Sequence, residues 1–258
     1  MRWLGTSAAA LARAASLPGV ADTDAGGTTL TIDWEQLPTY NTIMSVAAGA
    51  GLLLVVVLGW QLLTNAREVA TEGYALAFAA LGGILTLTGA HMTLTWPLAP
   101  TFPFDNIIFG EPALAFGVLM LVAAVHLWRH GPALREAPDV LAAFSRAYLP
   151  LSVFVVGMGL GSFGIAAAGV RYTLFAAPPQ EPISGQFADH PMVEAVFISG
   201  LYVLVGIGAV LFPLALRARR RNGVVTTVAV SWTLAGLAFL LFGALNYFTH
   251  IGLIVNTM

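Results

Sequence analysis

Six apolar runs, each long enough to cross a lipid bilayer, constrain the fold of this chain more than any other feature. A transmembrane helix needs roughly 20 apolar residues. Of the 258 residues, 58% are hydrophobic and only 9% are charged, a composition outside the range of soluble domains. The sequence therefore predicts an all-α fold, a polytopic transmembrane bundle of about six helices. The predicted spans are residues 42–63, 74–98, 112–128, 148–170, 191–216 and 224–254.

The predicted organisation has two parts, an extramembrane N-terminal arm over residues 1–41 and a six-span transmembrane domain over residues 42–258. The chain has no cysteine, which excludes disulfides, thiolate-bound iron–sulfur clusters and c-type haem attachment. Its basic residues are all arginine, so a retinal Schiff base, which needs a lysine, is excluded as well. The net charge of −2 gives no indication of a nucleic-acid partner.

The distribution of arginine predicts how the chain crosses the membrane. The loops after the first, third and fifth spans hold eight arginines, and the opposite side of the membrane holds three. Cytoplasmic loops carry an excess of positive charge. We therefore expect these three loops in the cytoplasm and both termini outside it, in a multi-pass protein of the cell (plasma) membrane.

Glu194 is the only carboxylate inside a predicted span, and an ionisable group within the membrane indicates a functional site by default. His190 precedes it by four residues, and Asn246 and His250 repeat that spacing in the last span. Residues four apart share one face of a helix. Together with His91 near the end of the second span, these side chains are expected at one level near the outer end of the bundle.

Imidazole and carboxylate groups suit a transition metal such as Cu, Fe or Zn. We therefore predict a metal site with His91, His190, Glu194, Asn246 and His250 as its ligands. Glu111 is expected to serve as a further ligand or as a proton acceptor, which makes Glu111 and Glu194 the candidate catalytic residues. Haem bound by two of the outer histidines is a less favoured alternative.

Simpler interpretations stay open for the same residues. Glu111 and His190 each stand directly before a proline, a pattern typical of helix starts. The helix dipole stabilises an acidic side chain there without any ligand. Asp105 and Asp189 are expected in solvated loops, and the polar residues near Glu194 are also compatible with a hydrogen-bonded network that holds no metal.

Two further segments have predicted structural roles. The stiff, proline-rich loop 178–182 is expected to cap the site or to dock a partner. In the fourth span, Gly157, Gly161 and Gly164 place small residues along one face, which is typical of close helix contact in membranes.

Three classes of function are compatible with these features. The first is a metal-dependent membrane oxidoreductase, or a hydrolytic enzyme, acting on a small or lipophilic substrate. The second is an accessory subunit of a larger membrane complex. The third is a proton or cation carrier that uses Glu194, although the cytoplasmic half of the bundle offers few polar residues to complete a path. The expected partners are the lipid bilayer and either other membrane subunits or further copies of the chain.

The segment Gly89-Ala90-His91-Met92-Thr93-Leu94-Thr95-Trp96-Pro97-Leu98, with Asn106-Ile107-Ile108-Phe109-Gly110-Glu111-Pro112, resembles a known family. This family comprises prokaryotic polytopic membrane proteins of unknown function, chiefly actinobacterial and archaeal. The likeness is clearest over residues 85–117. It implies a fold and a membrane location and no activity. It also implies that the residues of a recurring family motif are His91, Asn106, Gly110, Glu111 and Pro112.

Overall fold

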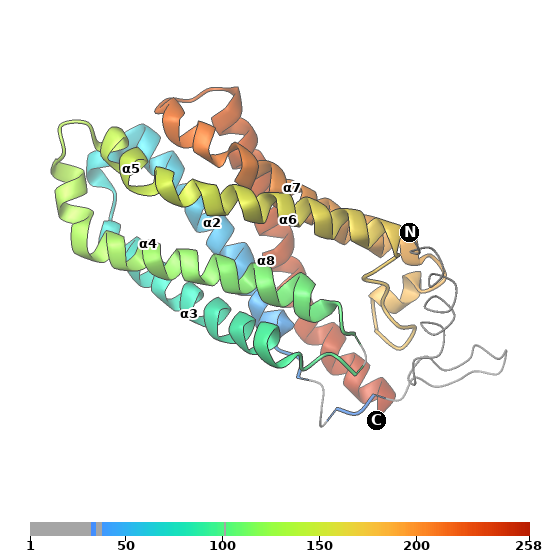
Figure 1. Ribbon diagram of the computed structural model, residues 1–258. Helices are drawn as coiled ribbons and strands as arrows, with labels where there is room; N and C mark the ends of the chain where they lie inside the picture. Colours follow the sequence, from blue (N-terminus) through green and yellow to red (C-terminus); the bar gives the residue numbers. More distant parts are fainter. Residues whose placement is uncertain (1–31, 35–37, 101) are drawn as a thin grey trace, which may run out of the picture.

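The computed structural model describes residues 32–34, 38–100 and 102–258, and these residues form helices and no strand. Most of the predicted arm, residues 1–41, therefore lies outside the described residues. Long helices run side by side along the bundle (Figure 1). They are α2 (Asn41–Asn65), α3 (Thr71–Thr95), α4 (Glu111–Glu136), α6 (Ser152–Arg171), α7 (Pro191–Ala218) and α8 (Gly223–Thr257). The shorter elements are η1 (Ala66–Glu68), η2 (Asn106–Gly110), α5 (Val140–Tyr148), η3 (Leu149–Leu151) and η4 (Ser184–Phe187).

The prediction of six membrane spans is confirmed, because six segments of the described chain are helical, long enough and apolar enough to cross a bilayer. Their bounds differ from the predicted ones where the helix and the apolar run do not coincide. The third span continues to Glu136, because residues 133–136 are good helix formers although they are less apolar. The fourth is preceded by α5 and by a turn that contains Pro150, which lacks the backbone N–H that a continuous helix needs.

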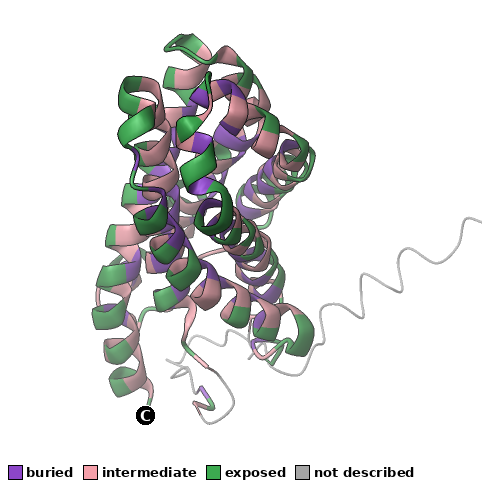
Figure 2. Ribbon diagram, turned by 90° about the vertical axis from the view of Figure 1, so that its left-hand side faces the viewer, coloured by how far each residue is buried: buried purple, intermediate pink, exposed green. Residues whose placement is uncertain are grey.

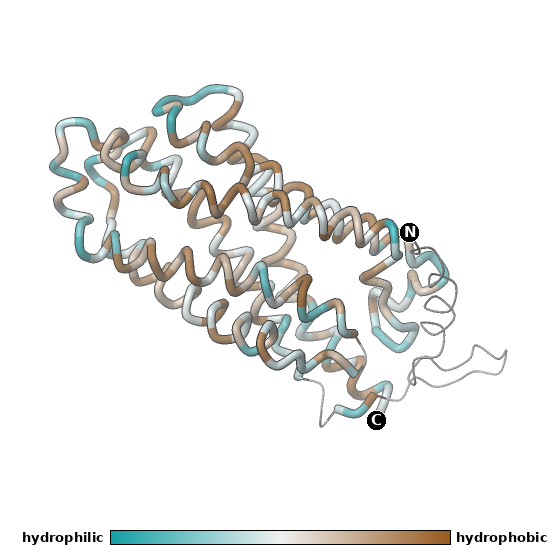
Figure 3. The backbone as a smooth tube through the Cα atoms, viewed as in Figure 1, coloured by the Kyte–Doolittle hydropathy of each residue, from teal (hydrophilic) through white to brown (hydrophobic). Residues whose placement is uncertain are grey.

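The surface of the bundle is apolar, as expected for a protein in contact with lipid. Leu87, Leu94 and Val153 expose 75%, 79% and 79% of their surface, and many other large apolar residues of the long helices are exposed as well. Exposed positions recur along the outer sides of the helices (Figure 2). Hydrophilic residues are concentrated towards the two ends of the bundle (Figure 3). Since such an apolar surface is rare on monomeric soluble proteins, the molecule is a multi-pass membrane protein.

The two ends of the bundle differ in charge. We call one the terminal end; it holds the starts of α2, α4 and α7 and the ends of α3, α6 and α8. We call the other the arginine end, since it carries the residues Arg67, Arg129, Arg135, Arg146, Arg217, Arg219, Arg220 and Arg221. The positive-inside rule predicts that the arginine end faces the cytoplasm.

Contacts between the helices follow an incomplete ring. Helix α3 packs along α4 and also contacts α2; α2 packs along α8, α8 along α7, and α7 along α6. The ring is open between α4 and α6, because these two helices barely contact one another. The short helix α5 joins these two helices at the arginine end (Figure 1).

Glycines allow the closest helix crossings, although not where the sequence predicts. A Cβ atom on Gly49 of α2 would collide with the backbone of Leu240 in α8, so only glycine permits this approach. By contrast, Gly157, Gly161 and Gly164 of α6 have no other part of the described chain within 4 Å of an added Cβ. The predicted close helix contact through these three glycines is therefore wrong within this chain, because α6 packs on α7 through a different face.

Candidate functional site: a cavity inside the bundle

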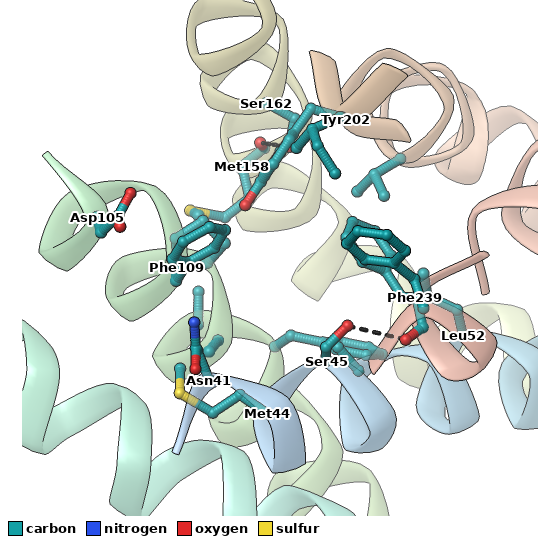
Figure 4. Close-up of a pocket in the computed structure, with 18 of the residues that line it drawn as sticks. Asn41, Met44, Ser45, Leu52, Asp105, Phe109, Met158, Ser162, Tyr202 and Phe239 are labelled. Carbon is teal, nitrogen blue, oxygen red and sulfur yellow. Dashed lines mark hydrogen bonds between the residues drawn. The ribbon is translucent and has the colours of Figure 1, made fainter. Parts of the chain in front are cut away.

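A cavity of about 750 Å³ lies inside the bundle and is lined by all six long helices and by the α6–α7 loop, residues 172–190. Its lining is mainly apolar and includes Phe116 of α4, Phe212 of α7 and Trp232 of α8. Figure 4 shows Phe109, Met158, Tyr202 and Phe239, which come from four different elements, around the same space. The volume falls in the range of roughly 300–1,000 Å³ that is typical of small-molecule sites.

The carboxyl, imidazole and amide groups of the lining all come from the terminal end of the bundle. They are the side chains of Asn41, Asp105, Glu181, Glu194, Asn246 and His250. No arginine lines the cavity among the described residues, and the chain has no lysine. Among these lining groups, the carboxyl groups can carry only negative charge, and a protonated His250 is the one possible positive charge.

Glu194 connects α7 to the α6–α7 loop. It lies in the first turn of α7, where the helix dipole favours a carboxylate, and its Oε2 atom accepts a hydrogen bond of 2.6 Å from the backbone N–H of Ala177. Both residues line the cavity. The carboxylate of Glu194, which lies inside a predicted span, thus has a partner in the protein backbone.

The α6–α7 loop folds back onto the end of α8 and brings a second carboxyl group, that of Glu181, to the cavity. The side chain of Asn256 donates a hydrogen bond of 2.8 Å to the backbone carbonyl of Gln180, and Pro182 lies directly against Gly252. Between these contacts, the carboxyl group of Glu181 lies near the hydroxyl of Thr249, which donates a hydrogen bond to Asn246. The loop therefore covers the terminal end of the cavity. The role expected for residues 178–182, to cap a metal site or to dock a partner, stays a prediction.

Two effects raise the pKa of Glu181. The larger is burial, which disfavours the charged carboxylate, and the smaller is the negative charge of the neighbouring Glu194; the nearby hydroxyl of Thr249 acts in the opposite direction. The two carboxyl groups are therefore close enough to influence one another.

Asp105 provides a further carboxyl group in the lining, just before η2 (Figure 4). Burial raises its pKa from 3.8 to about 7, so the solvated-loop role expected for Asp105 is wrong. Residues of η2 hold this wall in place, because the hydroxyl of Tyr202 in α7 donates a hydrogen bond of 2.8 Å to the backbone carbonyl of Ile108.

Some buried polar atoms in the lining have no hydrogen-bond partner among the described residues. At the terminal end these atoms are Oδ1 of Asn41 and Nδ1 of His250, and towards the arginine end the hydroxyl of Tyr148. A buried polar atom without a partner is unfavourable by about 1–3 kcal/mol. These atoms are thus positioned to bind a polar group inside the cavity.

The structure divides the predicted ligand set. Glu194, Asn246 and His250 border the cavity, whereas His91 and His190 do not. The ring nitrogen Nδ1 of His91 is hydrogen-bonded to the hydroxyl of Tyr40 over 2.7 Å. Among the described residues there is no group of three or more His, Asp or Glu side chains that could hold a metal ion. The five predicted ligands are therefore not assembled, because α3 turns His91 towards the start of α2 and away from the cavity.

The remaining predicted residues lie outside the cavity. His190 and Asp189 are exposed just before α7, and Glu111 is exposed in the first turn of α4. These are the positions that the helix-start interpretation expects. Asn106 has a structural role, since its Oδ1 accepts a hydrogen bond of 3.2 Å from the backbone N–H of Leu98.

Sequence reasoning did not select Glu181, Asp105, Asn41 or Tyr202 as site residues. One feature of the sequence could have pointed to Glu181: it is a carboxyl residue in a loop whose prolines limit the flexibility of the backbone. Asp105, directly after the apolar and proline residues 102–104, looked like an ordinary loop residue. Their positions depend on contacts between segments far apart in the chain, such as the bond between Tyr202 and Ile108.

The fold and the cavity define the class of this molecule, a multi-pass helical membrane protein with an internal site of ligand size. The chain belongs to the family described as "Protein of unknown function (DUF981)", whose model matches residues 38–252. No curated protein and no solved structure matches the chain. The resemblance to an uncharacterised membrane family is thus confirmed, while an actinobacterial or archaeal origin stays a prediction.

Proposed function

We propose that this protein binds an amphipathic molecule, with the apolar part of the ligand inside the cavity and its polar head at the terminal end. The observation that carries the proposal is the cavity of about 750 Å³ within the membrane-spanning bundle, whose carboxyl, imidazole and amide groups are confined to one end. Burial of an apolar chain along the remaining walls supplies affinity in proportion to its buried area.

The polar end favours a head group that donates hydrogen bonds or carries a positive charge. Oδ1 of Asn41 accepts hydrogen bonds and has no partner among the described residues, and the carboxyl groups of Glu181 and Glu194 lie in the same lining. A long-chain amine or alcohol matches these acceptors. A carboxylate head meets acidic groups with no arginine or lysine beside them, so it is disfavoured.

Neither metal-dependent oxidation nor membership of a larger complex is needed for this proposal. The predicted metal ligands are not grouped among the described residues, so the observations favour ligand binding over redox chemistry as the function of the cavity. Association with other subunits or with further copies of the chain stays a prediction.

Trp232 provides a reporter for the experiment, because it lines the cavity and is only 7% exposed. The full chain is prepared with its other tryptophans replaced by phenylalanine, and its thermal unfolding is compared with that of the original protein. Octadecyl chains brominated at mid-chain, with an amine, hydroxyl or carboxylate head, are then added in detergent micelles. Bromine quenches indole fluorescence only at short range, so saturable quenching reports entry into the cavity.

We expect saturable quenching by the amine and the alcohol, and weaker quenching by the carboxylate at neutral pH. A matched pair of variants separates the cavity from the lipid-facing surface. Ala123 lines the cavity, whereas the adjacent Val122 is 45% exposed. Ala123→Phe should therefore abolish saturable quenching and Val122→Phe should preserve it. Quenching that never saturates, or that is equal in both variants, contradicts the proposal.

A further inference from the structure

The cavity reaches the one place where neighbouring long helices are not packed together. The lining includes Ala115, Leu119 and Ala123 of α4. On the other side it includes Val155, Met158 and Ser162 of α6. Helices α4 and α6 barely contact one another, and Figure 1 shows them apart along the middle of the bundle. We call this part of the wall, residues 115–123 of α4 and 155–162 of α6, the α4–α6 window.

The window is bounded at both of its ends by side-chain contacts. Towards the terminal end, the rings of Phe109 and Phe175 lie 6.3 Å apart between their centroids, and both pack against the buried cluster that contains Ile108 and Ala166. Towards the arginine end, the ring of His126 in α4 lies 5.3 Å from that of Tyr148. The opening is therefore confined to the middle of the two helices.

On the side of α6 that faces away from α7, two residues next to the window, Gly157 and Gly161, carry no side chain. Each residue of an α-helix is rotated by about 100° from the one before it, so Gly157 and Gly161 lie on the opposite side of Met158 from Gly159. A Cβ atom on Gly159 would contact Ala209 of α7, whereas one on Gly157 or Gly161 would meet no other described residue within 4 Å. A side chain added at either glycine would therefore point to the side of α6 away from α7, beside the window, where the described part of the chain leaves space for it.

The window lies within the membrane-spanning parts of both helices, Asn106–Glu136 and Val140–Arg171. Its surroundings in the membrane are consequently hydrocarbon and not water. We propose that the cavity exchanges its ligand with the bilayer through the α4–α6 window, so that the ligand is a molecule dissolved in the lipid phase. This inference rests on the proposed function, because it assigns a route to the same ligand.

The route is tested by the rate at which the brominated octadecyl alcohol quenches Trp232 after rapid mixing of loaded and unloaded lipid vesicles containing the reporter protein. Gly161→Phe places a ring in the window. Leu160→Phe is the matched control, because Leu160 is the adjacent residue and is 59% exposed on the outer face of α6. We expect Gly161→Phe to slow both entry and release roughly tenfold or more, as closing an access path does, and Leu160→Phe to leave both rates unchanged.

The outcomes distinguish the two proposals. Saturable quenching at equilibrium with unchanged rates in Gly161→Phe overturns the lateral route and leaves the binding proposal intact. Absence of saturable quenching in the reporter protein itself overturns both. Gly157→Phe is made in parallel, with the same expectation, so that a folding defect in one variant, detected by thermal unfolding, still leaves a decisive measurement.

Discussion

The carboxylate of Glu194 accepts a hydrogen bond from the backbone N–H of Ala177, with 2.6 Å between Oε2 and N. This bond joins the first turn of α7 to the loop that covers the terminal end of the cavity. The hydrogen bond from the Asn256 side chain to the backbone carbonyl of Gln180 forms a second connection, between the same loop and α8. The wall around the polar head site is thus held by contacts between three elements.

Glu194→Ala should destabilise the protein, because it removes the acceptor and leaves the N–H of Ala177 without this partner. The expected loss is about 1–3 kcal/mol of the free energy of unfolding, measured by thermal or denaturant unfolding in detergent. Glu194→Gln retains an oxygen that accepts the same bond, so it should recover most of the loss.

Glu111→Ala is the matched control for that experiment, since Glu111 is also in the first turn of a helix but is exposed. Its effect should stay within about 0.5 kcal/mol, as for most surface substitutions. Equal destabilisation by Glu194→Ala and Glu111→Ala contradicts the assigned role of the Ala177 bond.

The stability of the protein should fall as the pH rises from about 4 to 7. Burial raises the pKa of Asp105 from 3.8 to about 7, so the folded chain retains a proton in this interval that the unfolded chain has released. Proton uptake therefore favours the folded state below the unfolded pKa, and this advantage is lost as the pH rises through the folded pKa. The raised pKa of Glu181 acts in the same direction.

Thermal unfolding midpoints measured across this pH range provide the test. Asp105→Asn cannot ionise at this position, so its profile should be flatter than that of the original protein. Parallel profiles for the variant and the original protein would show that Asp105 titrates normally.

Asp139 should matter more to stability than the arginine with which it pairs. Its Oδ1 accepts a hydrogen bond of 2.9 Å from the backbone N–H of Ala142 and so caps the start of α5, while Oδ2 forms an exposed ion pair with Arg219 over 3.2 Å. Exposed ion pairs contribute little, whereas N-caps contribute consistently. Asp139→Ala should thus lower the unfolding midpoint more than Arg219→Ala does, and Asp139→Ser should restore much of the difference.

The six spans could be predicted from the sequence, and so could the end of the bundle at which Glu194, Asn246 and His250 lie. The two predictions rest on different physical grounds. Bilayer thickness fixes the length of an apolar helix, so the six spans could be located without tertiary information. The four-residue spacing predicted that Asn246 and His250 share one face of the last span, and the structure brings both to the cavity. The same spacing did not place His190 beside Glu194, because His190 lies exposed just before α7 while Glu194 lines the cavity.

The rotation of α3 and the path of the α6–α7 loop could not be predicted in the same way. A membrane helix is apolar on its lipid-facing side as well as on its packed side, so hydropathy did not show that His91 turns towards Tyr40. Glu181 reaches its place only because its loop packs on α8, where Thr249 lies. A contact between residues so far apart in the chain leaves no local pattern.

His250 and His91 give the sharpest contrast between the cavity and the metal centre predicted from the sequence. His250 lines the cavity with its Nδ1 atom unpartnered among the described residues, whereas His91 is exposed and bonded to Tyr40. His250→Leu should weaken binding of the brominated alcohol roughly tenfold, which equals about 1.4 kcal/mol. His91→Leu should leave the affinity unchanged, because this side chain does not border the site. Elemental analysis of the same two purified variants separates the interpretations further. A metal held by the predicted ligand set would be lost from both variants, and that result would argue that the two histidines meet in the membrane although the structure keeps them apart.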